Sequence, residues 1–155
     1  MCLLADDMAE YKTVLLAEDE PDDAFLIGRA LHDVGVLNPV QAVADGAQAI
    51  AYLAGDGKFV DRLAFPFPGV LLLDLKMPNL DGLDVLHWLQ QNPHLRQSLT
   101  VVAMSSSLPA RTIESVHSFG IDLLIEKPVR YADLQARMRS IKARWLDHVG
   151  LTQPT

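Results

Sequence analysis

The sequence predicts an α/β domain, a doubly wound five-stranded parallel sheet of flavodoxin-like topology with strand order 2-1-3-4-5. Five short apolar runs alternate with five segments of helical periodicity. The run at 70–73 is apolar throughout, as expected for a strand buried on both faces. Right-handed crossovers leave few topologies, and open sheets of this size commonly use this order.

The first strand and helix follow residue 11. Residues 12–17 are β-prone, and an acidic segment containing Pro21 comes directly after them. Pro21 presets φ for a first helical turn, where acidic side chains meet the positive end of the helix dipole. We expect a helix that begins here and stops at Gly35. Its apolar positions at helical spacing are Phe25, Leu26, Ala30, Leu31 and Val34.

The second and third strands are expected at 40–44 and 70–74. Asp45 and Gly46 turn the chain from the second strand into a helix. A loop at 58–68, long for an α/β unit, then leads to the third strand.

The remaining elements complete the alternation. In order, we expect a helix from 82 to about 92, a strand at 100–104, a helix opened by Pro109 and stopped by Gly120, a strand at 123–125, and a helix from about 131 to 146.

The length of 155 residues, without any low-complexity tract, predicts one compact domain. We expect a leader at 1–11, the domain at 12–149 and a tail at 150–155. No second domain is expected after 150, so the output should be a protein contact. The candidates for that contact are Trp145, Leu146 and Val149, which could equally pack the last helix onto the sheet.

Composition excludes several classes of protein. A net charge of −7 argues against non-specific binding of nucleic acid. The basic cluster near the C-terminus is expected to be a solvated helix face; it comprises Arg137, Arg139, Lys142 and Arg144. The single cysteine, Cys2, cannot form an internal disulfide, which suits a reducing cytoplasmic compartment. We find neither a signal peptide nor a membrane span.

Polar residues follow four of the predicted strands. These residues are Glu18, Asp19, Asp74, Ser105 and Lys127. Because the carboxyl ends of parallel strands share one edge of the sheet, we expect them to converge there. Crowded carboxylates favour a cation, and oxygen ligands favour Mg²⁺. An alternative for the first acids is that Glu18, Asp19 and Asp22 only cap the first helix.

Together these residues resemble a known family, the receiver domains of two-component response regulators. The resemblance rests on Glu18-Asp19, Asp74 within Leu-Leu-Asp-Leu-Lys-Met-Pro, the Asp81-Gly82 turn, Ser105, and Lys127-Pro128. It spans about residues 12–146, and the combined pattern is highly specific.

The resemblance implies that Asp74 is the phosphoacceptor for a phosphoryl group carried on a histidine of a sensor kinase. It also implies a Mg²⁺ site in which Asp19 binds directly, Glu18 binds through water, and Asp74 and the backbone carbonyl of Lys76 complete the protein ligands. Lys127 would pair with a phosphoryl oxygen, and the family often has a cis peptide bond after this lysine.

By the same resemblance, Ser105 is the switch hydroxyl that turns toward the phosphoryl group. Lys76 and Ser107 lie where the family tunes hydrolysis of the acyl phosphate. Such a protein catalyses only its own phosphorylation and dephosphorylation. One position departs from the family pattern: Leu124 stands where many receivers carry Tyr or Phe, so aromatic switching is not expected there.

The Glu-Asp-x-Pro-x-Asp opening at 18–23, the long loop at 58–68 and Trp145 resemble the small stand-alone receivers that partner bacterial phytochromes. That resemblance implies a phytochrome-type sensor histidine kinase as partner. It also implies a homodimer formed through the last strand and the C-terminal segment.

Several other functions fit these residues less well. A docking module that is not phosphorylated stays open because of Leu124. An aspartyl-phosphate phosphatase typically needs a second Asp where Lys76 stands. A flavin carrier would need a Gly, Ser and Thr loop in place of Glu18-Asp19, and no G-x-G-x-x-G follows a strand, which argues against a dinucleotide site.

Overall fold

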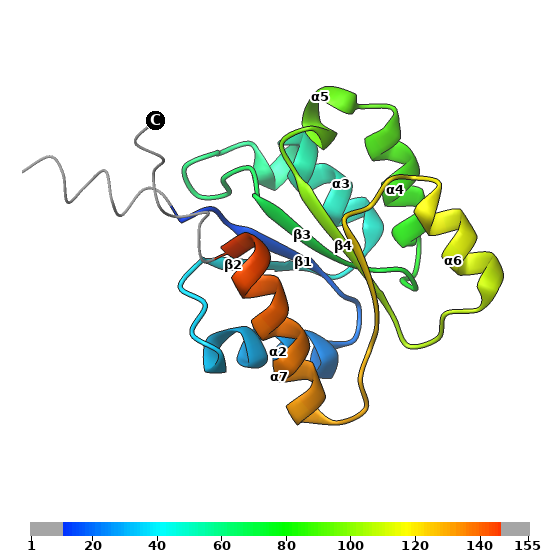
Figure 1. Cartoon of the computed structure of the whole chain (residues 1–155). Helices are drawn as coiled ribbons and strands as arrows, with labels where there is room; N and C mark the ends of the chain where they lie inside the picture. The colour runs from blue at the N-terminus through cyan, green and yellow to red at the C-terminus, as the bar shows by residue number, and fades with distance from the viewer. Residues whose placement is uncertain (1–10, 147–155) are drawn as a thin grey trace, which may run out of the picture.

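The computed structural model describes residues 11–146 and contains one five-stranded parallel sheet (Figure 1). The strand order is β2-β1-β3-β4-β5, so the predicted fold class and topology are confirmed. The strands are β1 (Val14–Ala17), β2 (Val40–Val43), β3 (Val70–Asp74), β4 (Thr100–Ser105) and β5 (Leu123–Glu126).

Helices cover both faces of the sheet. They are α2 (Pro21–Asp33), α3 (Gly46–Ala54), α4 (Gly82–Gln90), α5 (Pro93–Arg96), α6 (Ala110–His117) and α7 (Tyr131–Ile141), with a 3-10 turn η1 (Gly57–Phe59) and a π-helical turn η2 (Lys142–Leu146). In Figure 1, α2 and α7 lie side by side on one face, and α3, α4 and α6 lie on the other.

The core consists of two layers separated by the sheet. In β3, Leu71 and Leu73 pack with α3 and α4, whereas Val70 and Leu72 pack with α2 and α7. Successive side chains of a strand point to opposite faces, and both faces are covered here, so the whole run is apolar. Desolvation of these side chains fixes β3 at the centre of the sheet and brings its last residue, Asp74, to the carboxyl edge.

The apolar face of α2 differs from the one expected. Phe25 and Leu26 are 64% and 41% exposed, and the buried residues of the helix are Ile27, Ala30 and Leu31. At 100° per residue, positions 27, 30 and 31 form one stripe, and positions 25 and 26 fall outside it. The helix therefore presents two large apolar side chains to solvent beside the carboxyl edge of the sheet.

The long loop before β3 is held by an aromatic cluster and one arginine. Phe59 and Phe65 pack against Tyr52 of α3 and against each other. The Arg62 guanidinium donates to the carbonyl oxygens of Tyr52, Leu53 and Phe65 at 2.8–3.0 Å, which satisfies the last carbonyls of α3. The segment expected as a plain loop therefore contains η1 and is tied to the end of α3.

The last helix was expected to be continuous to residue 146, but α7 ends at Ile141 and continues as η2. Leu146 is buried and Trp145 packs partly against the same core, which supports packing as the role of these two residues. Of the basic cluster expected on a solvated face, Arg137, Arg139 and Arg144 are exposed, whereas Lys142 is half-buried. Two residues discussed above, Cys2 and Val149, lie outside the described residues. So do the expected tail at 150–155 and all of the expected leader except residue 11. Within residues 11–146, the structure has no helix with the length and apolar character needed to cross a membrane.

Candidate functional site

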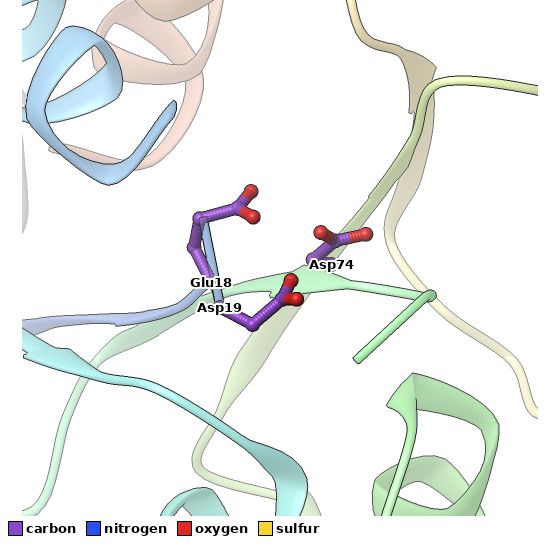
Figure 2. A group of neighbouring side chains, drawn as sticks. All are labelled: Glu18, Asp19 and Asp74. Carbon is purple, nitrogen blue, oxygen red and sulfur yellow. The ribbon is translucent and has the colours of Figure 1, made fainter. Parts of the chain in front are cut away.

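Three carboxylates meet where β1 and β3 end. β1 and β3 pair with Ala17 opposite Leu73, so the next residues, Glu18 and Asp74, lie side by side. Figure 2 shows the side chains of Glu18, Asp19 and Asp74 directed toward one another, and one ligand oxygen from each lies within 4.8 Å of the others. The predicted convergence of these three acids is confirmed. Of the acids in the alternative capping set, only Asp22 lies in the first turn of α2, and the N-cap residue of that helix is Glu20.

Lys127 brings a positive charge into this cluster from the end of β5. Its Nζ lies 2.5 Å from Oε1 of Glu18, 3.0 Å from Oδ2 of Asp74 and 3.3 Å from Oδ2 of Asp23. The predicted approach of Lys127 to Asp74 is therefore confirmed. The contact with Asp23 was not predicted, because the sequence presents Asp23 only as one of several acids in a first helical turn.

Burial controls the charge of these groups. The Glu18 side chain is fully buried, and this burial raises its pKa to about 7, although the hydrogen bond from Lys127 opposes the shift. Burial of Lys127 works against its charge, but hydrogen bonds to Glu18 and Asp74 outweigh burial and raise its pKa above the usual value. Three carboxylates thus share the single positive charge of Lys127. The clustered carboxylate oxygens of Glu18, Asp19 and Asp74 are the type of ligand that a hard divalent cation prefers.

The loop after β3 holds Asp74 from the other side. The backbone N–H of Lys76 donates to Oδ1 of Asp74 at 3.0 Å. Gly82 opens α4 beneath the strand end, where a Cβ would lie 2.6 Å from the Asp74 carbonyl oxygen, so only glycine fits. The loop is fixed to α3 by the hydrogen bond from Gly46 N to Leu80 O at 2.9 Å.

Ser105 ends β4 at the same edge and is fully buried. Its hydroxyl donates to the backbone carbonyl of Ser107 at 2.9 Å, within its own loop. The hydroxyl has its donor occupied in this structure, and a turn toward Asp74 stays a prediction. Leu124 is half-buried and packs against the layer containing α3 and α4. The peptide bond before Pro128 is trans, unlike the cis bond that the resemblance suggested.

Comparison with known proteins identifies the family. The model of the response regulator receiver domain matches residues 14–139. The chain belongs to this family. Among curated proteins, response regulator Rcp1 of Synechocystis sp. is 28% identical over 148 residues, which are 96% of this chain and 98% of Rcp1.

Solved receiver structures agree over almost the whole chain. The phosphorylated cyanobacterial phytochrome response regulator RcpA superposes with a TM-score of 0.80 at 30% identity, covering 94% of this chain and 99% of RcpA. Response regulator RPA3017, in red light signaling of R. palustris, gives 0.81 at 34% identity, covering 93% and 99%. This receiver is therefore homologous to phytochrome response regulators.

Proposed function

We propose that this receiver accepts a phosphoryl group from a sensor histidine kinase on Asp74. The observation that carries the proposal is the arrangement around that carboxylate. Asp74 is 4% exposed at the carboxyl edge of the sheet, with Lys127 Nζ 3.0 Å away and Glu18 and Asp19 beside it. An acid, an ammonium and two further carboxylates in one site are what phosphoryl transfer to an aspartate requires.

The chemistry follows from these groups. A carboxylate oxygen of Asp74 attacks phosphorus, the P–N bond of the phosphohistidine breaks, and its electron pair remains with the imidazole. The product is an acyl phosphate on Asp74. Lys127 pairs with a phosphoryl oxygen as a point charge. The Ser105 hydroxyl leaves the Ser107 carbonyl and donates to the same group, which draws the loop after β4 inward.

Mg²⁺ is the cofactor that these residues would hold. Asp19 would bind it directly, Glu18 through water, and Asp74 with the Lys76 carbonyl would complete the protein ligands. When bound, the ion neutralises the charge of the transferring oxygens. The Mn²⁺-bound form of Rcp1, which is 28% identical, supports a divalent site in this family.

The signal ends when water hydrolyses the acyl phosphate, and the protein itself promotes this step. Lys76, which follows Asp74 by two residues, and Ser107, in the loop after β4, set the lifetime of the signal. The partner kinase is of the bacterial phytochrome type, in the cytoplasm. Two similar proteins support this assignment: RcpA is a cyanobacterial phytochrome response regulator, and RPA3017 acts in red light signaling of R. palustris.

A homodimer is proposed through β5 and the C-terminal segment. Within residues 11–146, β5 is an edge strand of the sheet, and an edge strand can pair with a strand of another chain. Sedimentation at micromolar concentration, with and without a phosphoryl mimic, is expected to give twice the mass of one chain. A mass equal to one chain in both conditions contradicts the dimer.

The decisive experiment is phosphotransfer from a panel of the host's sensor kinases to the parent protein, Asp74→Asn and the control Asp56→Asn. We expect Mg²⁺-dependent labelling of the parent and the control, and none of Asp74→Asn. Equal labelling of Asp74→Asn would move the acceptor elsewhere. An unlabelled parent, with every kinase and with acetyl phosphate, would favour the docking module that the departure at Leu124 leaves open.

A further inference from the structure

We propose that Asp23 holds the Lys127 ammonium in the unphosphorylated protein and competes for it with the phosphoryl group on Asp74. Asp23 acts through Lys127, so it is a positioning residue. The inference rests on the proposed function, since it concerns the same acceptor. It adds a residue from α2 that tunes how tightly the site holds a phosphoryl group.

The hydrogen-bonding capacity of Lys127 creates the competition. An ammonium has three N–H donors and no acceptor. In this structure it has three carboxylate partners, Glu18, Asp74 and Asp23. Its donors are therefore fully used before any phosphoryl group arrives. A phosphoryl oxygen can pair with Lys127 only by displacing one of these partners or by weakening its contact.

The three partners differ in how easily they are released. Glu18 has the shortest contact, 2.5 Å, and its side chain is fully buried, so releasing it would leave a buried acid without its cation. Asp74 itself carries the incoming group. Asp23 has the longest contact, 3.3 Å, and its side chain is 44% exposed, so water can solvate the released carboxylate. Asp23 is the partner that the phosphoryl group displaces.

The negative charge of Asp23 also weakens phosphoryl binding directly, in addition to its competition for Lys127. Asp23 lies on the first turn of α2 and contacts the same ammonium as Asp74, so its carboxylate lies close to an anionic phosphoryl group carried on Asp74. Its carboxylate repels that anion and also attracts the ammonium away from it. Removing the charge at this position should therefore strengthen binding of a phosphoryl group and of its mimics.

The test compares two neighbouring acids of the same turn. Asp22 and Asp23 share the first turn of α2 and interact similarly with the helix dipole, but Asp22 is exposed and only Asp23 contacts Lys127. Beryllofluoride, a phosphoryl mimic, is titrated at saturating Mg²⁺ into the parent, Asp23→Asn, Asp22→Asn and Asp23→Glu. We expect Asp23→Asn to bind about two- to five-fold more tightly, the range that one exposed ion pair supports. Asp22→Asn and Asp23→Glu should stay close to the parent.

A second measurement needs neither Mg²⁺ nor a mimic. In the metal-free protein, the NMR signal of the Lys127 ammonium should shift in Asp23→Asn and stay in place in Asp22→Asn. A merely structural contribution of Asp23 to α2 would not distinguish the two variants in this way.

The outcomes separate this inference from the proposed function. Equal or weaker binding of beryllofluoride by Asp23→Asn overturns the competition, as does an equal gain in Asp22→Asn, which would indicate a general charge effect. An unchanged Lys127 signal in Asp23→Asn overturns the contact itself. If the parent does not bind beryllofluoride at all, the proposed phosphoacceptor fails and this inference fails with it.

Discussion

Lys127 is the residue on which the charge balance of the site depends. Within residues 11–146, it is the cation that contacts Glu18, Asp23 and Asp74. Replacing it by methionine, which has a similar length and no charge, would leave the buried Glu18 beside Asp74 without a counterion. We expect Lys127→Met to lower the free energy of unfolding of the metal-free protein by about 3 kcal/mol, the cost of breaking a buried pair.

Added Mg²⁺ should restore part of this loss, because a divalent cation neutralises the same carboxylates and binds the folded state. Urea denaturation of Lys127→Met with excess MgCl₂ or with a chelator measures the effect. Lys76→Met is the matched control, since Lys76 is exposed and its removal should change stability by no more than about 0.5 kcal/mol. Equal losses in the two variants would show that Lys127 does not stabilise the cluster.

For single residues, the sequence predicts which site residues lie at the ends of strands. It does not predict which residue of a helix points into the site. Glu18, Asp19, Asp74 and Lys127 could be predicted because the carboxyl ends of parallel strands share one edge. Asp23 could not, because its direction depends on where α2 begins and how the helix lies on the sheet. The hydrogen bond of Ser105 to its own loop also requires the three-dimensional path of that loop.

At the scale of elements, the start of α3 supports the loop that carries Lys76. Gly46 N donates to Leu80 O, and a Cβ on Gly46 would collide with that same carbonyl. Asn79, at φ 67°, adds a side-chain hydrogen bond to Asp45. We expect Gly46→Ala to lower the free energy of unfolding by about 1–3 kcal/mol, as overpacking does, in a urea titration.

At a second glycine, Gly28, substitution by alanine is expected to stabilise the protein. Gly28 lies inside α2, and a Cβ there would meet nothing within 4 Å. Gly28→Ala should therefore raise the free energy of unfolding by about 0.5–1 kcal/mol, because alanine restricts the unfolded chain and favours the helix. If Gly46→Ala were as stable as Gly28→Ala, the close contact between α3 and the loop after β3 would be wrong. The sequence predicts a turn at Gly46. The close approach of the Leu80 carbonyl, which also requires glycine there, is visible only in the folded structure.

At the scale of the molecule, the fold was predictable because local signals and global rules agree. Buried runs such as 70–73 define strands, and right-handed crossovers then order them. The exposed surface was less predictable. Phe25 and Leu26 were expected on the core face, because a helical pattern with several apolar residues allows more than one stripe. Leu26, which lines a cavity together with Lys127, places apolar area beside the acceptor site.

This apolar area suggests where a large phosphodonor contacts the receiver. Leu26 lines a cavity of about 300 Å³ between α2 and α7, together with Val129 and Lys127. Val129 is fully exposed, and Lys127 connects the cavity to Asp74. A kinase that delivers its phosphohistidine to Asp74 would cover this surface, whereas a small donor such as acetyl phosphate would not need it.

We therefore expect Leu26→Ser to slow phosphotransfer from the cognate kinase about five- to ten-fold, the effect of removing one interface anchor, and to leave labelling by acetyl phosphate unchanged. Leu63→Ser is the control: Leu63 is 95% exposed in the loop before β3, at the opposite edge of the sheet. Because the two donors use the same Asp74, any loss of folding would slow both reactions equally. Unchanged phosphotransfer from the kinase to Leu26→Ser, or equal slowing by Leu63→Ser, would place the kinase contact away from α2.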